Sequence, residues 1–336
     1  MGLSWTKSMA GEAMSAAKTD TAAAGAGVLD RLFGGGCVLG DGAMGTMLCD
    51  RGLSIGRCYD ELNLSQPATI ASVHDEYLHA GTEIVETNTF GANAYRLDRH
   101  GLRDKVREIN LAGVRIARRC VAQIAEQQSL EACVAGAVGP LGVRLAPFGK
   151  LDMDEARAAF AEQIGALAEG GQGVGADLLI LETMTSLAET YEAIRAAHDV
   201  APRLRLVAMM TVDEEGNCLD GTSAEITAAR LGEFGADAVG CNCSHGPANV
   251  LGVIERMRAV THLPLAAMPN AGLPHVVEGR NIYTVSPEDM AGFVRKAIEA
   301  GASLIGGCCG TTPSHTRAMK SAMLASGSLN FRSRSR

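Results

Sequence analysis

The stretch DLLILETMTSLAETYEAIRAAHD, residues 177–199, contains one complete repeat of the pattern that decides the fold. It begins with the segment DLLILET at 177–183, whose centre at 178–181 is continuously apolar, and continues at 187–199 with apolar residues at helical spacing. An uninterrupted apolar run of this length predicts a strand buried on both faces, as in a parallel sheet. The amphipathic segment that follows predicts a helix that covers one face of that sheet.

The same pattern recurs along the chain. Further strands are predicted at 37–40, 83–87, 133–138, 204–210, 238–243, 263–268 and 303–308. Further helices are predicted at 68–81, 107–127, 155–171, 224–235, 248–260 and 287–301. Eight strands that alternate with helices over about 290 residues predict an α/β fold, a single-domain (β/α)8 TIM barrel, with a doubly wound sheet as the alternative.

The barrel is expected to span residues 30–325. Residues 1–29, rich in Ala, Gly, Ser and Thr, predict a flexible extension, for which a transit peptide is the alternative. Residues 326–336 predict a flexible basic tail.

Composition excludes several classes of function. The chain has 336 residues, of which 47% are hydrophobic, and a net charge of -8 from 30 basic and 38 acidic residues. This balance argues against nucleic acid as a partner, and no apolar run approaches the roughly 20 residues that a membrane helix needs. The 10 cysteines lack the dense spacing of a secreted disulfide scaffold, so we expect a reducing compartment, the cytoplasm.

A polar or glycine-rich cluster follows every predicted strand. The clusters are DGAMGT (41–46), TNTFGAN (87–93), GPLG (139–142), ET (182–183), TVDEEG (211–216), NCSHGP (242–247), PNAGLP (269–274) and CCGTTP (308–313). In a (β/α)8 barrel the carboxyl ends of the strands share one rim, where active sites are assembled. The functional groups are therefore expected on one face.

The first cluster overlaps GDGAMG, residues 40–45, which has the spacing of a dinucleotide-binding turn. That motif requires a second strand within about 30 residues and an acid near its end, whereas the next predicted strand begins at 83. Asp41 would also place a carboxylate in the turn that must hold pyrophosphate. We therefore interpret the stretch as a rim loop whose backbone N–H groups hold a substrate carboxylate.

The last cluster points to a metal. Cys308 and Cys309 are flanked by glycines that let the backbone leave the strand path, so both sulfurs can turn toward one ion. Cys241 or Cys243, which would share one face of a regular strand, offers a third thiolate. Three protein thiolates and one open position form a catalytic zinc site, at which a substrate thiol is held as thiolate.

Together these motifs resemble those of the homocysteine S-methyltransferase family. The motifs are LGDGAMGTML (39–48), ETNTFGAN (86–93), GPLG (139–142), ILET (180–183), GCNCSHGP (240–247), MPNAGLP (268–274) and GGCCGTTPSHTRAM (306–319). RCYDELNLSQP (57–67) is similar to bacterial proteins that join such a barrel to a methylenetetrahydrofolate reductase. The family's homocysteine-binding barrel is also the first module of cobalamin-dependent methionine synthase.

The resemblance implies roles for individual residues. It assigns the zinc thiolates, and with them catalysis, to Cys243, Cys308 and Cys309, and makes Cys241 a neighbour inside the barrel. It further implies the following substrate-binding residues: Glu182 for the homocysteine amino group, Asp41 and Gly42 near the amino acid and the metal, Asn270 close to zinc, and Asn88 along the same rim.

The activity that the resemblance implies is zinc-dependent methyl transfer to the thiolate of L-homocysteine, which yields L-methionine. The donor stays open among S-methylmethionine, S-adenosylmethionine and a methylcorrinoid or methylfolate system. We expect no corrinoid or folate module within the chain, so methylcobalamin would be carried by a separate corrinoid or folate-binding protein. The alternative is a non-catalytic subunit that binds homocysteine and zinc and serves such a protein.

Overall fold

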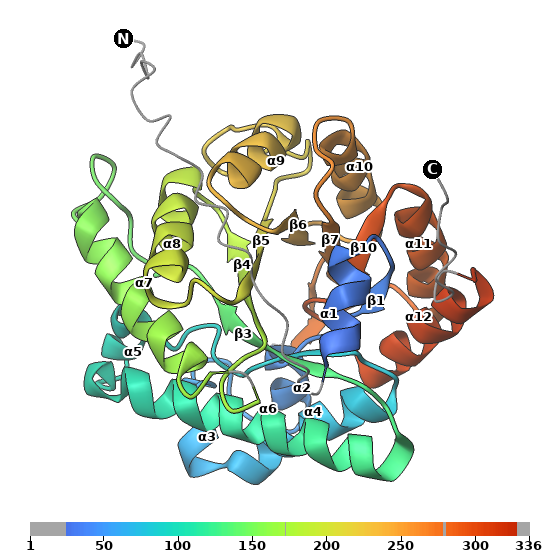
Figure 1. The fold of residues 1–336 in the computed structure, drawn as a ribbon, viewed down its shortest axis with the longest axis horizontal. Coiled ribbons are helices and arrows are strands. Elements are labelled where there is room, and N and C mark those ends of the chain that lie inside the picture. Colours follow the sequence, from blue (N-terminus) through green and yellow to red (C-terminus); the bar gives the residue numbers. More distant parts are fainter. Residues whose placement is uncertain (1–24, 172, 278–279, 328–336) are drawn as a thin grey trace.

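The computed structural model describes residues 25–327 except residues 172, 278 and 279, and within this part a ring of parallel strands is surrounded by helices (Figure 1). The strands of the ring are β1 (Val38–Leu39), β2 (Ile84–Glu86), β3 (Cys133–Val138), β4 (Leu178–Met184), β5 (Arg205–Met210), β6 (Ala238–Cys243), β7 (Leu265–Pro269) and β10 (Ala302–Ile305). Their order is β1-β10-β7-β6-β5-β4-β3-β2. An isolated parallel bridge between Gly40 and Ile84 joins β1 to β2, so the predicted (β/α)8 barrel is confirmed.

The seven predicted helices are all present, with ends within a few residues of the expected ones, and the remaining helices were not predicted. The helices are α1 (Ala26–Phe33), α2 (Gly45–Asp50), α3 (Leu62–Ser65), α4 (Pro67–His79), α5 (Ala94–Asp98), η1 (Arg103–Lys105), α6 (Val106–Gln128), α7 (Met153–Ala168), α8 (Leu187–Val200), α9 (Ala224–Glu233), α10 (Pro247–Arg258), α11 (Pro287–Glu299) and α12 (Pro313–Ala325). Side chains cap several of them: Ser223 accepts from the N–H of Ile226 at α9, and Ser286 forms a capping box at α11.

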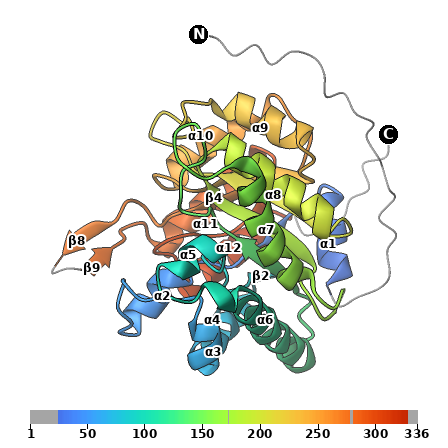
Figure 2. The same ribbon diagram turned by 90° about the vertical axis from the view of Figure 1, so that its left-hand side faces the viewer.

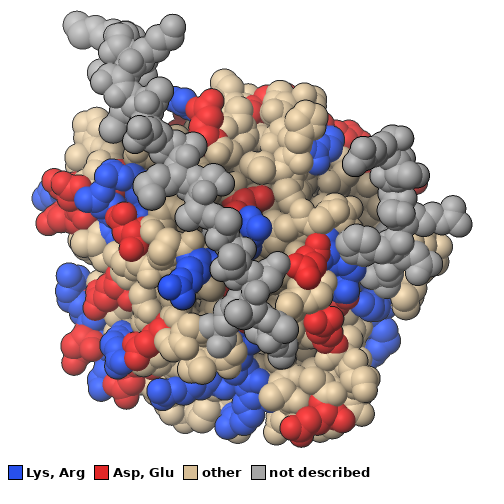
Figure 3. Space-filling model, in the orientation of Figure 1, with Lys and Arg blue, Asp and Glu red and all other residues tan. Residues whose placement is uncertain are grey.

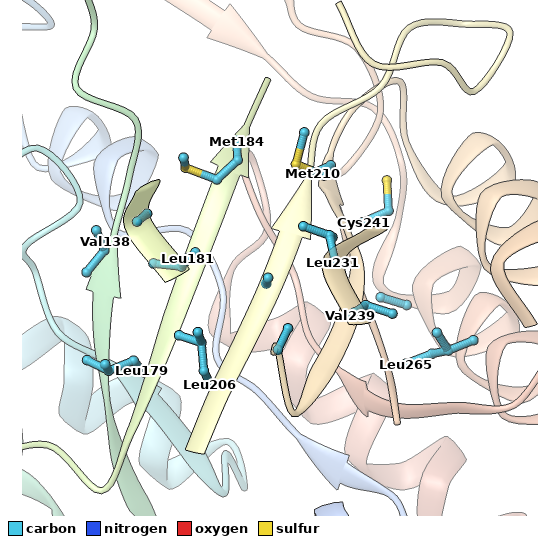
Figure 4. Close-up of a cluster of buried hydrophobic side chains, with 14 of the residues drawn as sticks. Val138, Leu179, Leu181, Met184, Leu206, Met210, Leu231, Val239, Cys241 and Leu265 are labelled. Atoms are coloured by element: carbon cyan, nitrogen blue, oxygen red, sulfur yellow. The ribbon is translucent and has the colours of Figure 1, made fainter. Parts of the chain in front are cut away.

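Alternate residues of each strand enter two separate apolar layers. One layer lies between the strands and the helices, and Figure 4 shows part of it, including Leu179, Leu181 and Val239. The other fills the barrel interior with residues such as Leu178 and Ile180, and is closed at one end by α1. Because both faces of each strand are buried, the centres of the strands are apolar, as is typical of a parallel sheet.

The sequence predicts four cysteines to be buried apolar residues, and the structure buries them in these layers or in the packing of α6. Each is at most 4% exposed; they are Cys37, Cys120, Cys133 and Cys218. They contribute to packing and stand apart from the rim.

Three further features differ from the sequence-based expectation. The boundary predicted at residue 30 falls inside α1, and the hairpin of β8 (His275–Val277) and β9 (Arg280–Ile282) was not predicted. The last barrel strand ends at Ile305 rather than at 308. Figure 2 shows α1 and the hairpin at opposite ends of the barrel. The predictions for residues 1–24 and 328–336 lie outside the described residues.

On the face shown in Figure 3, acidic and basic side chains are interspersed, as the sequence composition leads us to expect. Among the described residues, no helix combines the length and the apolar character that crossing a membrane requires.

Candidate active site

Three cysteine thiols meet at the carboxyl ends of the strands. Cys243 is the last residue of β6, and Cys308 and Cys309 lie in the loop between β10 and α12. The three sulfur atoms lie within 4.8 Å of one another, and the Sγ atoms of Cys243 and Cys309 are 4.0 Å apart. The structure thus brings together the three cysteines that the family resemblance selects.

Backbone geometry decides which cysteine of β6 joins the cluster. Cys243 has φ 61 and the next residue, Ser244, has φ 59, so the chain turns left-handed as the strand ends. This turn breaks the two-residue alternation, and Cys243 therefore does not share the face of Cys241. Non-glycine residues adopt such angles at a cost of order 1–3 kcal/mol, typically at functional sites.

The position expected for Cys241 was wrong. Cys241 does not lie inside the barrel but packs in the layer between strands and helices, near Val239 and Leu265 (Figure 4). Its thiol contacts Ser244 Oγ at 3.4 Å, and burial raises its pKa to about 12. It is therefore a packing residue.

Hydrogen bonds to two neighbouring strands fix the loop of Cys308 and Cys309. The N–H of Cys308 donates to Pro269 O at 2.8 Å, and the N–H of Gly307 donates to Asp41 O at 2.8 Å. The carbonyl of Cys309 accepts from Ala271 N–H at 2.9 Å. The two thiols are thereby held against the ends of β1 and β7 instead of pointing to opposite faces of a strand.

Only glycine is compatible with the next position of that loop. Gly310 has φ 79, and a Cβ atom there would lie 2.1 Å from the ring of Tyr283. Tyr283 follows the β8–β9 hairpin, so this loop brings an aromatic ring to the cysteine cluster.

The thiols polarise one another. Hydrogen bonds from Cys243 and Cys308 hold the pKa of the Cys309 thiol well below its ordinary value. Hydrogen bonds to Cys243 and Cys309, together with burial, raise the pKa of Cys308. The cluster therefore favours negative charge on one of its three sulfur atoms, that of Cys309, and a thiolate is the form of cysteine that binds metals.

The arrangement fits a zinc ion. Sulfur atoms that bind one tetrahedral zinc at about 2.3 Å are about 3.8 Å apart, close to the 4.0 Å between Cys243 and Cys309. Asn270 lies beside them: its Nδ2 donates to Ser244 O at 2.9 Å, whereas its buried Oδ1 has no hydrogen-bond partner among the described residues. Three soft sulfur ligands and one unpaired oxygen suit zinc better than magnesium or calcium.

A cavity of about 500 Å³ extends from the thiols and is lined by carboxylates. Glu182 of β4 and Asp41 after β1 both line it, as the sequence predicts. Burial, and after it the charge of Cys309, raises the pKa of Glu182 to about 7. Burial and the charge of Glu182 raise the pKa of Asp41. Such shifts mark carboxyl groups that lack a counter-charge.

Gly42 and Asn88 line the same cavity. A side chain at Gly42 would meet Thr311 Oγ1 at 2.6 Å, so this loop can approach the loop between β10 and α12 only with glycine there. Asn88 Nδ2 donates to Tyr59 O at 2.8 Å and to Asn63 Oδ1 at 3.1 Å. Both amide hydrogens of Asn88 are thus used to hold the loop that leads to α3.

The sequence analysis missed three residues of the cavity. Asn242 connects the two halves of the site: its Nδ2 donates to Thr183 Oγ1 at 2.9 Å and approaches Glu182 Oε2 at 3.4 Å and Cys308 Sγ at 3.9 Å. Arg96 adds a half-buried cation to the cavity lining, with its guanidinium over the ring of Phe90.

The third missed residue, Glu86, is the last residue of β2. Glu182 lies at the equivalent end of β4, near its carboxyl terminus. Each of these acids is followed by a threonine at the carboxyl end of a predicted strand. This repeated Glu-Thr pair is a sequence signal from which Glu86 could have been predicted. His315, by contrast, has a structural role, because both nitrogens of its ring are used in contacts with Thr312 Oγ1 and Val285 O.

The fold and the site define a (β/α)8-barrel protein whose rim combines a three-cysteine cluster with unpaired carboxylates. Residues 38–323 match the sequence profile of homocysteine S-methyltransferases. The chain belongs to the homocysteine S-methyltransferase family, which places it in the methyltransferase class of enzymes.

Similar proteins agree with this assignment. The chain is 32% identical over 300 residues to methionine synthases of Mycobacterium leprae and Mycobacterium tuberculosis; each match covers 85% of this chain and 24% of the relative. It thus spans about a quarter of the length of these relatives.

Solved structures of the Escherichia coli homocysteine methyltransferase MmuM are 27% identical to the chain. The metallated form has a TM-score of 0.74 and covers 88% of this chain and 98% of its own. The oxidised form has a TM-score of 0.73, with 88% and 97% covered.

Proposed function

We propose that the protein is a zinc-dependent homocysteine S-methyltransferase that forms L-methionine. The observation that carries the proposal is the single cavity in which the thiols of Cys243, Cys308 and Cys309 face buried carboxylates. Zinc held by these three cysteines would keep the substrate thiol as a thiolate at neutral pH. A thiolate is the nucleophile that accepts a methyl group, so no protein base is required at the methyl.

The chain's own residues orient the amino acid. Glu182 offers a carboxylate to the substrate ammonium group, and Asn242 holds Glu182 near the thiols. Asp41 is fixed because its Oδ2 accepts from the N–H of Glu86 at 2.9 Å. The backbone of the Gly42 loop lines the cavity and supplies N–H donors for the substrate carboxylate. Asn270 supplies its unpaired oxygen beside the thiols.

The methyl donor is the open part of the reaction. The match covers 98% of the E. coli homocysteine methyltransferase, which supports a barrel that methylates homocysteine by itself; the donor would then be small, S-methylmethionine or S-adenosylmethionine. The match covers only a quarter of the methionine synthases, which supports a donor held outside this barrel; methylcobalamin or a methylfolate system, bound by a corrinoid or folate-binding protein, would then supply the methyl group. We place the protein in the cytoplasm, where free thiols persist.

The decisive experiment offers the reduced, zinc-loaded protein L-homocysteine together with one donor at a time. The donors are S-methylmethionine, S-adenosylmethionine, betaine, methylcobalamin and methyltetrahydrofolate, and methionine is measured by mass spectrometry. Methionine from a sulfonium donor would support the stand-alone enzyme, and methionine from methylcobalamin alone would support the need for a corrinoid protein. Zinc and homocysteine binding without methionine from any donor would favour the alternative, a non-catalytic subunit of such a protein.

A further inference from the structure

Glu86 is a half-buried residue whose carboxyl group the proposed mechanism does not yet use. It is the last residue of β2, and it lines the cavity with Asp41 and Glu182. Its Oε2 atom is buried and has no hydrogen-bond partner among the described residues. Leaving such an acceptor unpaired costs about 1–3 kcal/mol, more for a charged group, so this atom calls for a ligand.

Glu86 forms no ion pair with the described basic residues of its cavity, of which Arg96 is half-buried. None of the ion pairs among the described residues includes Glu86, Glu182 or Asp41. Burial, followed by the charges of Glu182 and Asp41, raises the pKa of Glu86. The Glu86 and Glu182 carboxyl groups are also close enough to share a hydrogen bond when one of them is protonated.

The geometry points to a cationic group between these carboxyls. An ammonium group has three N–H donors and a positive charge, and it can satisfy several carboxylate oxygens at once. We propose that Glu86 binds the α-ammonium group of the substrate together with Glu182, and so makes the site selective for an amino-acid thiol over the same thiol without its amine. This inference rests on the proposed function, because it takes homocysteine as the ligand.

The contribution of the Glu86 side chain can be separated from that of its backbone. The contact with Asp41 Oδ2 is made by the N–H of Glu86, which any residue at this position retains. Glu86→Gln therefore preserves the position of Asp41 and changes only the carboxyl group. Glu192→Gln is the matched control, because Glu192 is buried, at 3% exposed, and pairs with Arg195 on α8 away from the cavity.

The test measures thiol binding to the reduced, zinc-loaded protein by titration calorimetry, and so needs no methyl donor. The two ligands are L-homocysteine and 4-sulfanylbutanoate, which lacks only the amine. We expect E86Q to weaken homocysteine binding about tenfold and to leave 4-sulfanylbutanoate within about twofold. Glu86→Asp, which keeps the charge, should bind homocysteine more tightly than E86Q, and E192Q should match the wild type for both ligands.

Zinc content and melting temperature, measured for every variant, report whether each protein is folded and loaded. If folded, zinc-loaded E86Q binds homocysteine as the wild type does, or loses affinity for both thiols equally, Glu86 does not bind the ammonium group. If E86Q does not fold, the same comparison is made with E86D alone, for which an unchanged preference between the two thiols overturns the inference. A wild-type protein that binds neither thiol overturns the proposed function itself.

Discussion

The two ends of the barrel handle buried acids in opposite ways. At the end that α1 closes, Glu83, Asp177 and Asp237 stand just before β2, β4 and β6. Each accepts a hydrogen bond from the backbone of the preceding strand, at Leu39, Val134 and Leu206 respectively.

Each of these acids also has a basic partner within the protein. Glu83 pairs with Arg31 and Lys320, Asp177 with Arg118 at 2.6 Å and Asp237 with Arg205 at 2.7 Å. At the other end, Asp41, Glu86 and Glu182 lie beside three thiols and belong to no ion pair among the described residues. Charges that serve stability are neutralised internally, whereas those at the rim are left for a ligand.

The largest effect is expected from the cysteines at the rim that we propose as metal ligands. Cys308→Ser replaces a thiolate by a hydroxyl that binds zinc poorly, so tight zinc binding and activity should fall together, the rate by at least about a thousandfold. Zinc content by elemental analysis and methionine formation by mass spectrometry check this. Full activity in this variant would remove the cysteine cluster from the reaction.

A substitution at the other end of the barrel, which α1 closes, should change stability alone. Glu83→Gln removes the charge that neutralises Arg31 and Lys320, whose side chains are 20% and 19% exposed. We expect a loss of about 2 kcal/mol, less than for a fully buried pair, because water solvates part of both cations. Calorimetric unfolding should show a melting temperature lower by about 5 °C, with homocysteine affinity unchanged. A change in affinity would mean that the two ends are coupled.

Glu182 is the acid at the rim to compare with Glu83 at the other end of the barrel. Glu182→Gln removes a carboxylate that we assign to the substrate amine, so homocysteine binding should weaken about tenfold, or ~1.4 kcal/mol. Zinc content should stay normal because Glu182 is not a metal ligand. The stability should not fall as it does in Glu83→Gln, since no cation loses its partner. Unchanged homocysteine affinity, measured by calorimetry, would exclude Glu182 from the binding site.

The smallest effect is expected at Cys241, two residues from a metal ligand but packed against helices. Cys241→Ala should cost only about 1 kcal/mol of stability and leave zinc content and activity unchanged. Denaturant unfolding and elemental analysis test this directly. Loss of zinc from this variant would contradict the distinction between Cys241 and Cys243 on which the rim assignment depends.

Sequence patterns determined most of the architecture. Apolar runs and helical periodicity are local properties, so the strands at 133–138 and 238–243 were predicted with their observed ends, and most helices within a few residues. Cys308 and Cys309 were found as a pair after a predicted strand, whereas Cys243, Glu182 and Asp41 were assigned by the resemblance to the family; all five were expected on one rim because parallel strands in a barrel end on the same side. The hairpin formed by β8 and β9 was missed because its short strands lie outside the repeating pattern.

The tertiary structure alone decided in which direction some side chains point and which charged groups they contact. Periodicity places Cys241 and Cys243 on one face, and only the left-handed backbone at Cys243 and Ser244 separates them. Glu83 and Glu86 are three residues apart on one strand segment, yet one meets two cations and the other meets two acids. The sequence by itself determined which elements form and which residues reach the rim. Which charges remain unpaired was decided by contacts between segments distant in the chain, because local sequence carries no record of the partners that folding brings together.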